Sequence, residues 1–232
     1  MTLPVSEHFG PVVQGEGPHT GRRVAFLRLG LCNLRCSWCD TPYTWDRTRY
    51  DVNAESPPME WQAIALAIKE LGCDTLVLSG GEPLIHQTNQ DLRSLLSGLG
   101  MTIHVETNGT LKPERWLNTR VAHWSVSPKL ANGSDPQHRR IRRVALDWFA
   151  TAAREGRCVF KFVAVNPSDL AEVADLVNGH HIPASAVWIM PEGTDAVTLL
   201  DRARLLEPYV LAEGWNLTLR QQILLHGDRR LT

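Results

Sequence analysis

The residues whose type and spacing most clearly indicate chemistry are Cys32, Cys36 and Cys39, which share one short loop at C-x-x-x-C-x-x-C spacing. A four-iron iron–sulfur cluster normally takes four thiolates, so three leave one iron open to a small molecule and to reaction. The alternative is a structural zinc loop, which needs a fourth ligand. Cys73 and Cys158 stand apart in apolar stretches, as buried free cysteines commonly do.

Length and composition limit the possible classes of protein. The chain has 232 residues, 43% of them hydrophobic, and we expect one domain over residues 1–232, with a core at about 20–193 and a C-terminal strand and tail over 194–232. No long apolar run or secretory leader is recognisable, and the cysteine count of five is odd, so we expect a reduced, cytoplasmic protein without a disulfide framework. The net charge of -1 predicts no general attraction to membranes or nucleic acid.

Strands and helices are predicted to alternate along the chain. Repeated βα units specify a parallel sheet covered by helices, and about six strands are too few for an eight-stranded barrel, so we expect an incomplete α/β barrel. The expected helices are 59–71, 90–99, 142–154, 169–178 and 195–206, and the expected strands are 23–29, 75–78, 102–105, 123–126, 158–165, 186–190 and 216–219.

Polar clusters follow the predicted strands. Besides the cysteine loop, they are residues 79–83, 106–109, 127–129 and 190–193. Because ligands of parallel α/β folds bind at the carboxyl ends of strands, we expect one active site at this rim. Taken singly, the glycines at 80, 81 and 109 could be ordinary turns, and Lys129 could be solvated.

A basic run at residues 138–143 contains four arginines. It could bind phosphate or a tRNA backbone, but it leads into a predicted helix, and charge runs are usually solvated faces. We therefore predict a solvated face and no direct nucleic-acid partner.

Seven motifs occur in an order that resembles the 7-carboxy-7-deazaguanine synthases, a family of radical S-adenosylmethionine (SAM) enzymes. The resemblance covers about residues 10 to 193. The motifs are Val13-Gln14-Gly15-Glu16-Gly17-Pro18, Phe26-Leu27-Arg28, the cysteine loop ending in Asp40-Thr41, Ser79-Gly80-Gly81-Glu82-Pro83-Leu84, Glu106-Thr107-Asn108-Gly109, Ser127-Pro128-Lys129 and Met190-Pro191-Glu192-Gly193.

The resemblance implies a homodimeric lyase with a partial (β6α3) TIM-like barrel. Such an enzyme contracts 6-carboxy-5,6,7,8-tetrahydropterin to 7-carboxy-7-deazaguanine with loss of ammonia, a step in 7-deazapurine (queuosine-type) biosynthesis. It uses a 4Fe-4S cluster, SAM and Mg²⁺, and an electron donor such as flavodoxin or ferredoxin. The reduced cluster cleaves SAM to a 5'-deoxyadenosyl radical, which takes hydrogen from carbon 6 of the pterin.

The resemblance also implies roles for individual residues. Cys32, Cys36 and Cys39 would hold the cluster, and Thr41 would be the protein ligand to Mg²⁺. SAM would lie against Trp38, Gly81, Ser127, Pro128, Lys129, Met190, Pro191 and Glu192. The pterin would bind Val13, Gln14, Gly15, Glu16, Arg28, Ser79 and Gln222. Gln14 and Glu16 offer donors and acceptors for an aminopyrimidinone, and Arg28 offers a bidentate fork for a carboxylate.

Two positions depart from the family pattern. Gln222 stands where many members have histidine, and it cannot be a cationic partner or a general acid. Leu31 precedes the first cysteine where relatives commonly have glycine.

Two alternatives stay open at this point. The first is an activase-like radical SAM enzyme that abstracts hydrogen from a polypeptide, although it would have no stated use for Gln14, Glu16 and Thr41. The second is a metal-stabilised binding module without catalysis, although such a module would not need so many polar clusters at strand ends.

Overall fold

The computed structural model describes residues 2–232, and within these residues one sheet contains nine strands in the order β3-β1-β2-β4-β5-β6-β7-β8-β9. From β2 to β9 all neighbours are parallel, whereas β1 is antiparallel to β2 and β3. The strands are β1 Leu3–Val13, β2 Arg23–Leu29, β3 Pro58–Met59, β4 Thr75–Gly80, β5 Thr102–Thr107, β6 Val121–Val126, β7 Cys158–Ala164, β8 Val187–Pro191 and β9 Asn216–Leu217.

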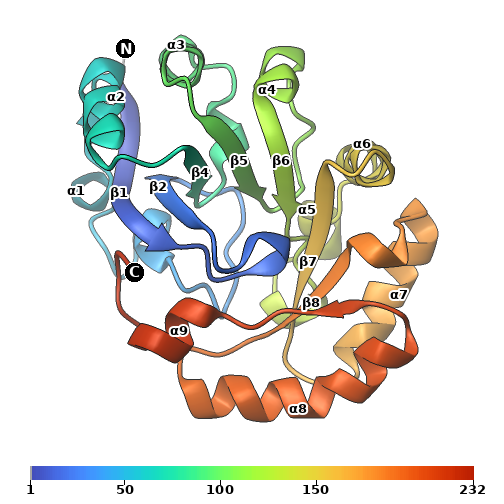
Figure 1. Cartoon of the computed structure of the whole chain (residues 1–232). Helices are drawn as coiled ribbons and strands as arrows, with labels where there is room; N and C mark the ends of the chain where they lie inside the picture. The colour runs from blue at the N-terminus through green and yellow to red at the C-terminus, as the bar shows by residue number, and fades with distance from the viewer. Residues whose placement is uncertain (1) are drawn as a thin grey trace.

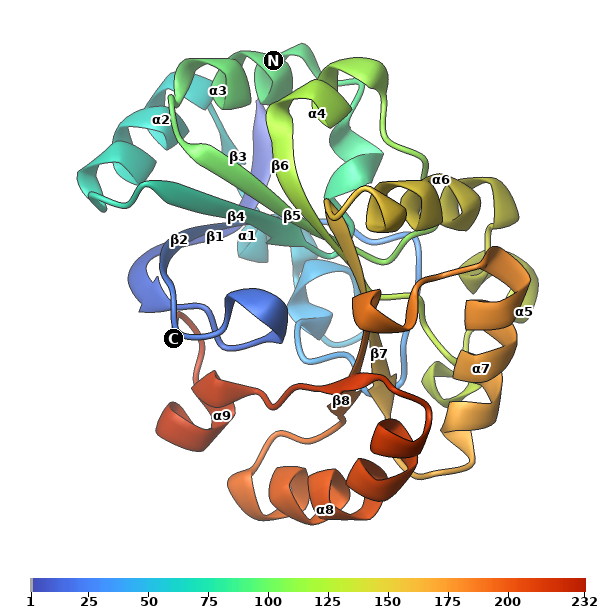
Figure 2. The same cartoon turned by 45° about the vertical axis from the view of Figure 1, so that its right-hand side comes forward.

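Helices follow the parallel strands and cover the outside of the curved sheet (Figures 1 and 2). This arrangement confirms the predicted α/β fold and is that of a partial TIM-like barrel. The helices are α1 Val52–Glu55, α2 Trp61–Glu70, α3 Gln90–Gly98, α4 Arg115–Arg120, α5 Gln137–Arg140, α6 Arg143–Arg154, α7 Asp169–His180, α8 Ala196–Ala212 and α9 Gln221–His226.

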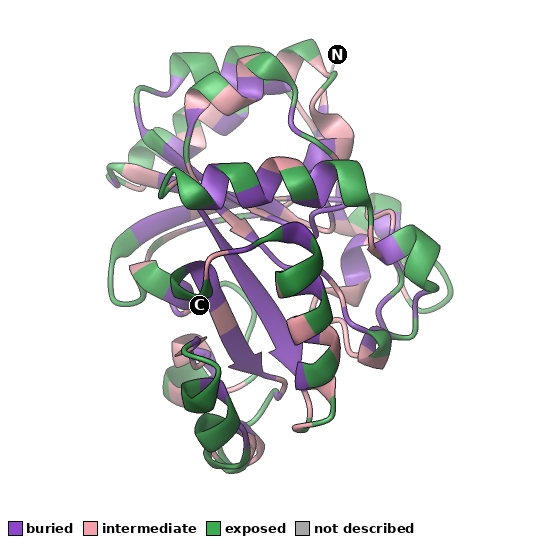
Figure 3. Cartoon of the chain, turned by 90° about the vertical axis from the view of Figure 1, so that its right-hand side faces the viewer, coloured by how far each residue is buried: buried purple, intermediate pink, exposed green. Residues whose placement is uncertain are grey.

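Successive side chains of each strand point to opposite faces of the sheet, one toward the hydrophobic core under the helices and the other toward the barrel interior. On β5, Ile103 and Val105 belong to the hydrophobic core, whereas Glu106 lines an inner cavity. On β6, Trp124 packs against Phe149 of α6, and Ser125 lines the cavity. Figure 3 shows the resulting pattern of buried strands and helices that expose one face.

Several elements differ from the sequence prediction: β1, β3, α1, α4, α5 and α9 were not predicted, and α8 is longer than expected. Strand β1 was not predicted because Pro4, Gly10 and Pro11 interrupt its alternation, yet Gly10 and Pro11 fall in a register shift between Phe9 and Val12, where a strand tolerates proline. Helix α8 continues six residues past the predicted end, through Pro208, whose exposed position leaves the unpaired carbonyl of the preceding turn to solvent.

The isolated cysteines and the basic run can also be placed. Cys73 and Cys158 are free and buried in the core, which confirms the prediction.

The prediction of a solvated face for the basic run is correct for Arg139, Arg142 and Arg143 but wrong for Arg140. Arg140 is buried because it pairs with Glu172 and donates to two backbone carbonyls.

No helix within residues 2–232 has the length and apolar character needed to cross a membrane.

Three imidazoles cluster inside the barrel. The ring centroid of His19 lies 4.4 Å from those of His104 and His123, and the latter two are 5.3 Å apart. Burial, repulsion by His19 and the charge of Arg22 lower the pKa of His104 to about 4. Burial and the same neighbours, together with His104, lower the pKa of His123 to about 3. Both rings are therefore neutral in the folded protein at pH 7.

These depressed pKa values predict acid sensitivity. In the unfolded chain the rings bind protons below pH 6.5, so their contribution to stability is complete above 6.5 and declines as the pH falls toward 4. Acidification from pH 7.5 to 5.0 should cost about 2 kcal/mol per histidine in the free energy of unfolding. Urea unfolding at the two pH values measures this loss. The double variant His104→Gln/His123→Gln should lose less unfolding free energy between the two pH values than the parent, whereas the exposed His138→Gln should lose as much as the parent. Equal losses in the parent and both variants would contradict the prediction.

Candidate active site

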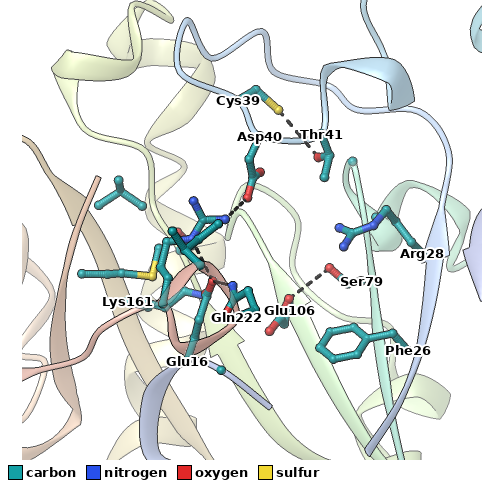
Figure 4. Close-up of a pocket in the computed structure, with 18 of the residues that line it drawn as sticks. Glu16, Phe26, Arg28, Cys39, Asp40, Thr41, Ser79, Glu106, Lys161 and Gln222 are labelled. Atoms are coloured by element: carbon teal, nitrogen blue, oxygen red, sulfur yellow. Dashed lines mark hydrogen bonds and ion pairs between the residues drawn. The ribbon is translucent and has the colours of Figure 1, made fainter. Parts of the chain in front are cut away.

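The polar clusters surround one cavity of about 240 Å³ at the carboxyl ends of the parallel strands. Nearly all residues that the sequence nominated line it, and only Pro128 and Pro191 of that set do not. In Figure 4, Cys39 and Thr41 lie on one side of the cavity, Arg28 and Phe26 on a second, and Glu16, Lys161 and Gln222 on a third. The predicted convergence on one rim is therefore confirmed.

The cysteine loop begins with an unusual backbone conformation. Leu31 has φ of +70°, in the left-handed region that favours glycine. The loop packs on the turn after β4, where a Cβ on Gly81 would lie 2.2 Å from the Leu31 carbonyl oxygen and 2.8 Å from Cys32 Cβ. Only glycine permits this approach. Gly81 thus shapes the cysteine loop.

The other side of the loop rests on residues 132–135. The carboxylate of Asp135 accepts from Arg35 N at 2.7 Å and lies 3.8 Å from Cys36 Sγ. Ser37 N donates to the Gly133 carbonyl at 3.1 Å. Both flanks of the loop are therefore fixed by partners distant in sequence.

Burial makes two of the loop thiols, Cys32 and Cys36, hard to ionise. Burial raises the pKa of Cys32 to about 12, and burial raises the pKa of Cys36 to about 11 despite the charge of Lys129. Coordination to iron supplies the positive charge that deprotonates such thiols. Trp45 Nε1 donates to Cys39 Sγ at 3.3 Å, which stabilises negative charge on sulfur.

The donor set fits a cluster with an open iron better than a zinc ion. Within the part of the chain that the structure describes, no three or more His, Cys, Asp or Glu side chains are grouped as ligands of a single ion. Cys32, Cys36 and Cys39 line the cavity, and the two remaining cysteines are buried in the core. Three soft thiolates around an open cavity match a 4Fe-4S cluster that keeps one iron for a ligand.

Glu82 joins two of the strand-end loops. Its buried carboxylate accepts from Leu84 N at 3.0 Å, Thr107 Oγ1 at 2.8 Å and Asn108 N at 2.6 Å. Asn108 in turn donates to Asn33 of the cysteine loop at 2.8 Å. The Gly-Gly-Glu-Pro and Glu-Thr-Asn-Gly motifs therefore also hold the cysteine loop in place.

Glu16 is the centre of a buried charge network. Lys161 forms an ion pair with it, Arg220 Nε lies 3.3 Å from its Oε1, and Gln222 Nε2 donates to the same oxygen at 2.7 Å. Burial opposes its ionisation, but the charges of Lys161 and Arg220 outweigh burial and lower its pKa to about 2. Glu16 is therefore anionic at neutral pH.

The C-terminal segment lies directly against the Glu16 loop. A Cβ on Gly15 would lie 1.8 Å from Gln222 Oε1, so any larger residue would displace this contact. Arg220 also pairs with Asp40, which stands between Cys39 and Thr41. The oxygen Thr41 Oγ1 lies 3.7 Å from Cys39 Sγ. Arg220 thus connects the cysteine loop to the opposite wall of the cavity.

Arg28 presents its outer nitrogens to the cavity. Its Nε donates to Glu7 at 2.7 Å, and Glu7 also accepts from Arg230 Nε at 2.7 Å. The guanidinium carbon of Arg230 lies 3.8 Å from the ring centroid of Tyr43. Because Nε is occupied, the Nη groups of Arg28 are the ones that face the cavity (Figure 4).

The sequence places Glu106 in a cluster at the rim without assigning it a contact, and it does not single out Lys161. Glu106 accepts from Gln14 Nε2 at 3.3 Å and from Ser79 Oγ at 3.1 Å, so it joins two nominated residues. Lys161 lies in the middle of β7, in which every residue is buried. A single lysine within an apolar strand is the signal that could have identified it.

The residues nominated for SAM gather beside the cysteine loop. Lys129 Nζ donates to Ser127 Oγ at 2.9 Å and lies 5.4 Å from the ring centroid of Trp38. Trp38 Nε1 donates to Asn132 at 3.1 Å, which fixes the indole plane. Glu192 pairs with Arg202 of α8.

Comparison with known proteins identifies the family. The Radical SAM superfamily matches residues 28–178. The 7-carboxy-7-deazaguanine synthase of Pyrobaculum aerophilum is 33% identical over 220 residues, which are 94% of this chain and 92% of the relative. That of Rhodopirellula baltica is 34% identical over 232 aligned positions, with 94% and 85% covered.

Solved structures agree with these relatives. QueE from Escherichia coli has a TM-score of 0.67 at 25% identity, with 95% of each chain covered. Streptococcus suis SuiB, at 16% identity and a TM-score of 0.52 over 82% of this chain and 46% of its own, shares the fold alone. The chain belongs to the 7-carboxy-7-deazaguanine synthase family of the radical SAM superfamily.

Proposed function

We propose that this protein converts 6-carboxy-5,6,7,8-tetrahydropterin to 7-carboxy-7-deazaguanine with release of ammonia. One observation carries the proposal: three thiols and the Glu16, Glu106 and Arg28 side chains face a single cavity, in a chain that matches named synthases over nearly its whole length. The comparisons favour this reaction over an activase or a non-catalytic module.

The cofactors would lie against the cysteine loop. Cys32, Cys36 and Cys39 would hold the cluster, and Trp38, Ser127 and Lys129 lie where SAM could reach the open iron. When bound, the reduced cluster and SAM supply the radical that removes hydrogen from substrate carbon 6. The chain's own contribution is to seat both groups and to shield the site from water within the barrel.

The pterin would lie deeper in the cavity, between charges of both signs. The anionic Glu16 and the carboxylate of Glu106 can accept hydrogen bonds from the N–H groups of an aminopyrimidinone. The Nη groups of Arg28 can bind the substrate carboxylate as a bidentate fork. Gln222 offers a neutral amide where many relatives have histidine. Because an amide cannot act as a general acid, another group would have to supply any proton that the histidine supplies in those relatives.

Magnesium and a second copy of the chain complete the proposal. The neutral hydroxyl of Thr41 suits a Mg²⁺ ion that takes its other ligands from water and substrate oxygens. A homodimer and an external low-potential electron donor are proposed from the family resemblance.

The reaction itself is the first prediction to test. The protein, reconstituted anaerobically with iron and sulfide and supplied with SAM, dithionite, Mg²⁺ and 6-carboxytetrahydropterin, should form 7-carboxy-7-deazaguanine detectable by mass spectrometry. Deoxyadenosine without this product would mean a different substrate. The absence of both products would contradict radical chemistry.

Cluster ligation predicts a contrast between two buried cysteines. Cys36→Ala should reduce deoxyadenosine formation to background and lower the iron content, because a ligand is lost while the fold persists. Cys73→Ala is the matched control, since this cysteine lies in the core, and it should cost only about 1 kcal/mol of stability. Iron analysis, circular dichroism and SAM cleavage check both variants. Retained SAM cleavage in Cys36→Ala would contradict its assignment.

The magnesium assignment predicts a selective loss. Thr41→Ala should keep the cluster absorbance but lower turnover and flatten its response to Mg²⁺, because one oxygen ligand is removed. Thr41→Ser retains the hydroxyl and should behave as the parent. A Mg²⁺ titration of product formation that is identical in Thr41→Ala and the parent would show that Thr41 is not a ligand.

A further inference from the structure

Three exposed arginines belong to the cysteine loop or to the segment packed beside it. Arg35 belongs to the loop itself, and Arg139 and Arg142 come from the basic run that follows it in the sequence by a hundred residues. Arg139 Nη2 donates to the Asn33 carbonyl at 3.1 Å, which places this part of α5 directly against the loop. Figure 2 shows α5 at the outer edge of the molecule. We call Arg35, Arg139 and Arg142 the basic patch.

The arginines of the basic patch form no ion pair within the described residues. Ion pairs within residues 2–232 involve Arg140 and Arg143 of the same run but not Arg35, Arg139 or Arg142. Arg142 also stands at the N-cap of α6, whose amino terminus adds partial positive charge. Since the whole chain has a net charge of -1, this concentration of positive charge is a local feature. Clustered charge that forms no ion pair favours a partner of opposite charge.

At this surface, buried and exposed residues of the cysteine loop are adjacent in sequence. Cys36 is buried, but its neighbours Arg35 and Ser37 on either side are exposed. The thiol therefore faces inward while the loop backbone faces solvent. A protein docked on the basic patch would lie close to a cluster held by Cys36, with the loop backbone and residues 132–135 beside it.

We propose that the basic patch is the docking surface of an acidic, low-potential, one-electron carrier protein. The inference rests on the proposed function, because a radical SAM reaction needs an electron at this loop. In the step, the reduced carrier loses one electron and the oxidised cluster gains it, and no atom or proton is transferred. The arginines attract and orient the carrier, so they are not catalytic residues. An RNA backbone would also be attracted by positive charge, but it would not explain why the patch adjoins the cysteine loop.

The first measurement is binding, independent of turnover. A reduced-charge variant, Arg35→Glu/Arg139→Glu/Arg142→Glu, is compared with Lys69→Glu/Arg115→Glu/Arg204→Glu, which carries the same charge change at exposed positions elsewhere. An acidic flavodoxin is titrated with each holoenzyme in a calorimeter. We expect the patch variant to bind at least ~10-fold more weakly than the control, and the parent Kd to rise with ionic strength.

The second measurement separates this inference from the proposed function. Product formation is driven either by reduced flavodoxin or by dithionite, a small reductant that needs no docking surface. The patch variant should lose most of its flavodoxin-driven rate and keep its dithionite-driven rate and iron content. If the parent itself forms no product with either reductant, the proposed function is rejected, and the docking surface is then judged by the binding measurement.

Two results would overturn the inference. One is a flavodoxin affinity and flavodoxin-driven rate in the patch variant equal to those of the matched control. The other is tRNA binding that depends on the patch while flavodoxin binding does not. Because Arg139 touches the loop backbone, Arg142→Glu alone is also measured; it makes no contact with the cysteine loop and should weaken flavodoxin binding without altering iron content.

Discussion

The buried charges around Glu16 hold the site together. Glu16 comes from the loop after β1, Lys161 from β7, Arg220 from the segment before α9, and Asp40 from the cysteine loop. Removing one partner from a buried pair typically costs about 3 to 5 kcal/mol, because the other charge is left uncompensated. Three segments far apart in sequence are thereby fixed around the cavity, and Arg220 also reaches the exposed Asp40 of the cysteine loop.

Such a network suits a ligand rich in donors and acceptors. The paired charges keep Glu16 ionised despite its burial, as its pKa of about 2 indicates. Glu7 does the same for Arg28 on the opposite wall, where Nε is held and the Nη groups are free to bind. Both walls therefore present polar groups that are already oriented toward the cavity.

A close backbone approach and two carboxylates position the cysteine loop. Gly81 allows the turn after β4 to approach Cys32, Glu82 ties that turn to β5, and Asp135 supports the loop from the other side. The motif glycine and glutamate act as structural supports for the three thiols. This explains how motifs separated along the chain can serve a single loop.

The sequence by itself determined the α/β alternation, the cysteine spacing and the rim at which the motifs meet, because these depend on local periodicity and on the parallel direction of strands. Tertiary structure alone decided that Glu106 joins Gln14 to Ser79, that Lys161 pairs with Glu16, and that Arg220 joins Glu16 to Asp40. It also decided that Arg140 is buried while Arg139 and Arg142 face solvent. The physical reason is that burial and ion pairing arise between segments distant in sequence. No local pattern records which charged residue finds a partner.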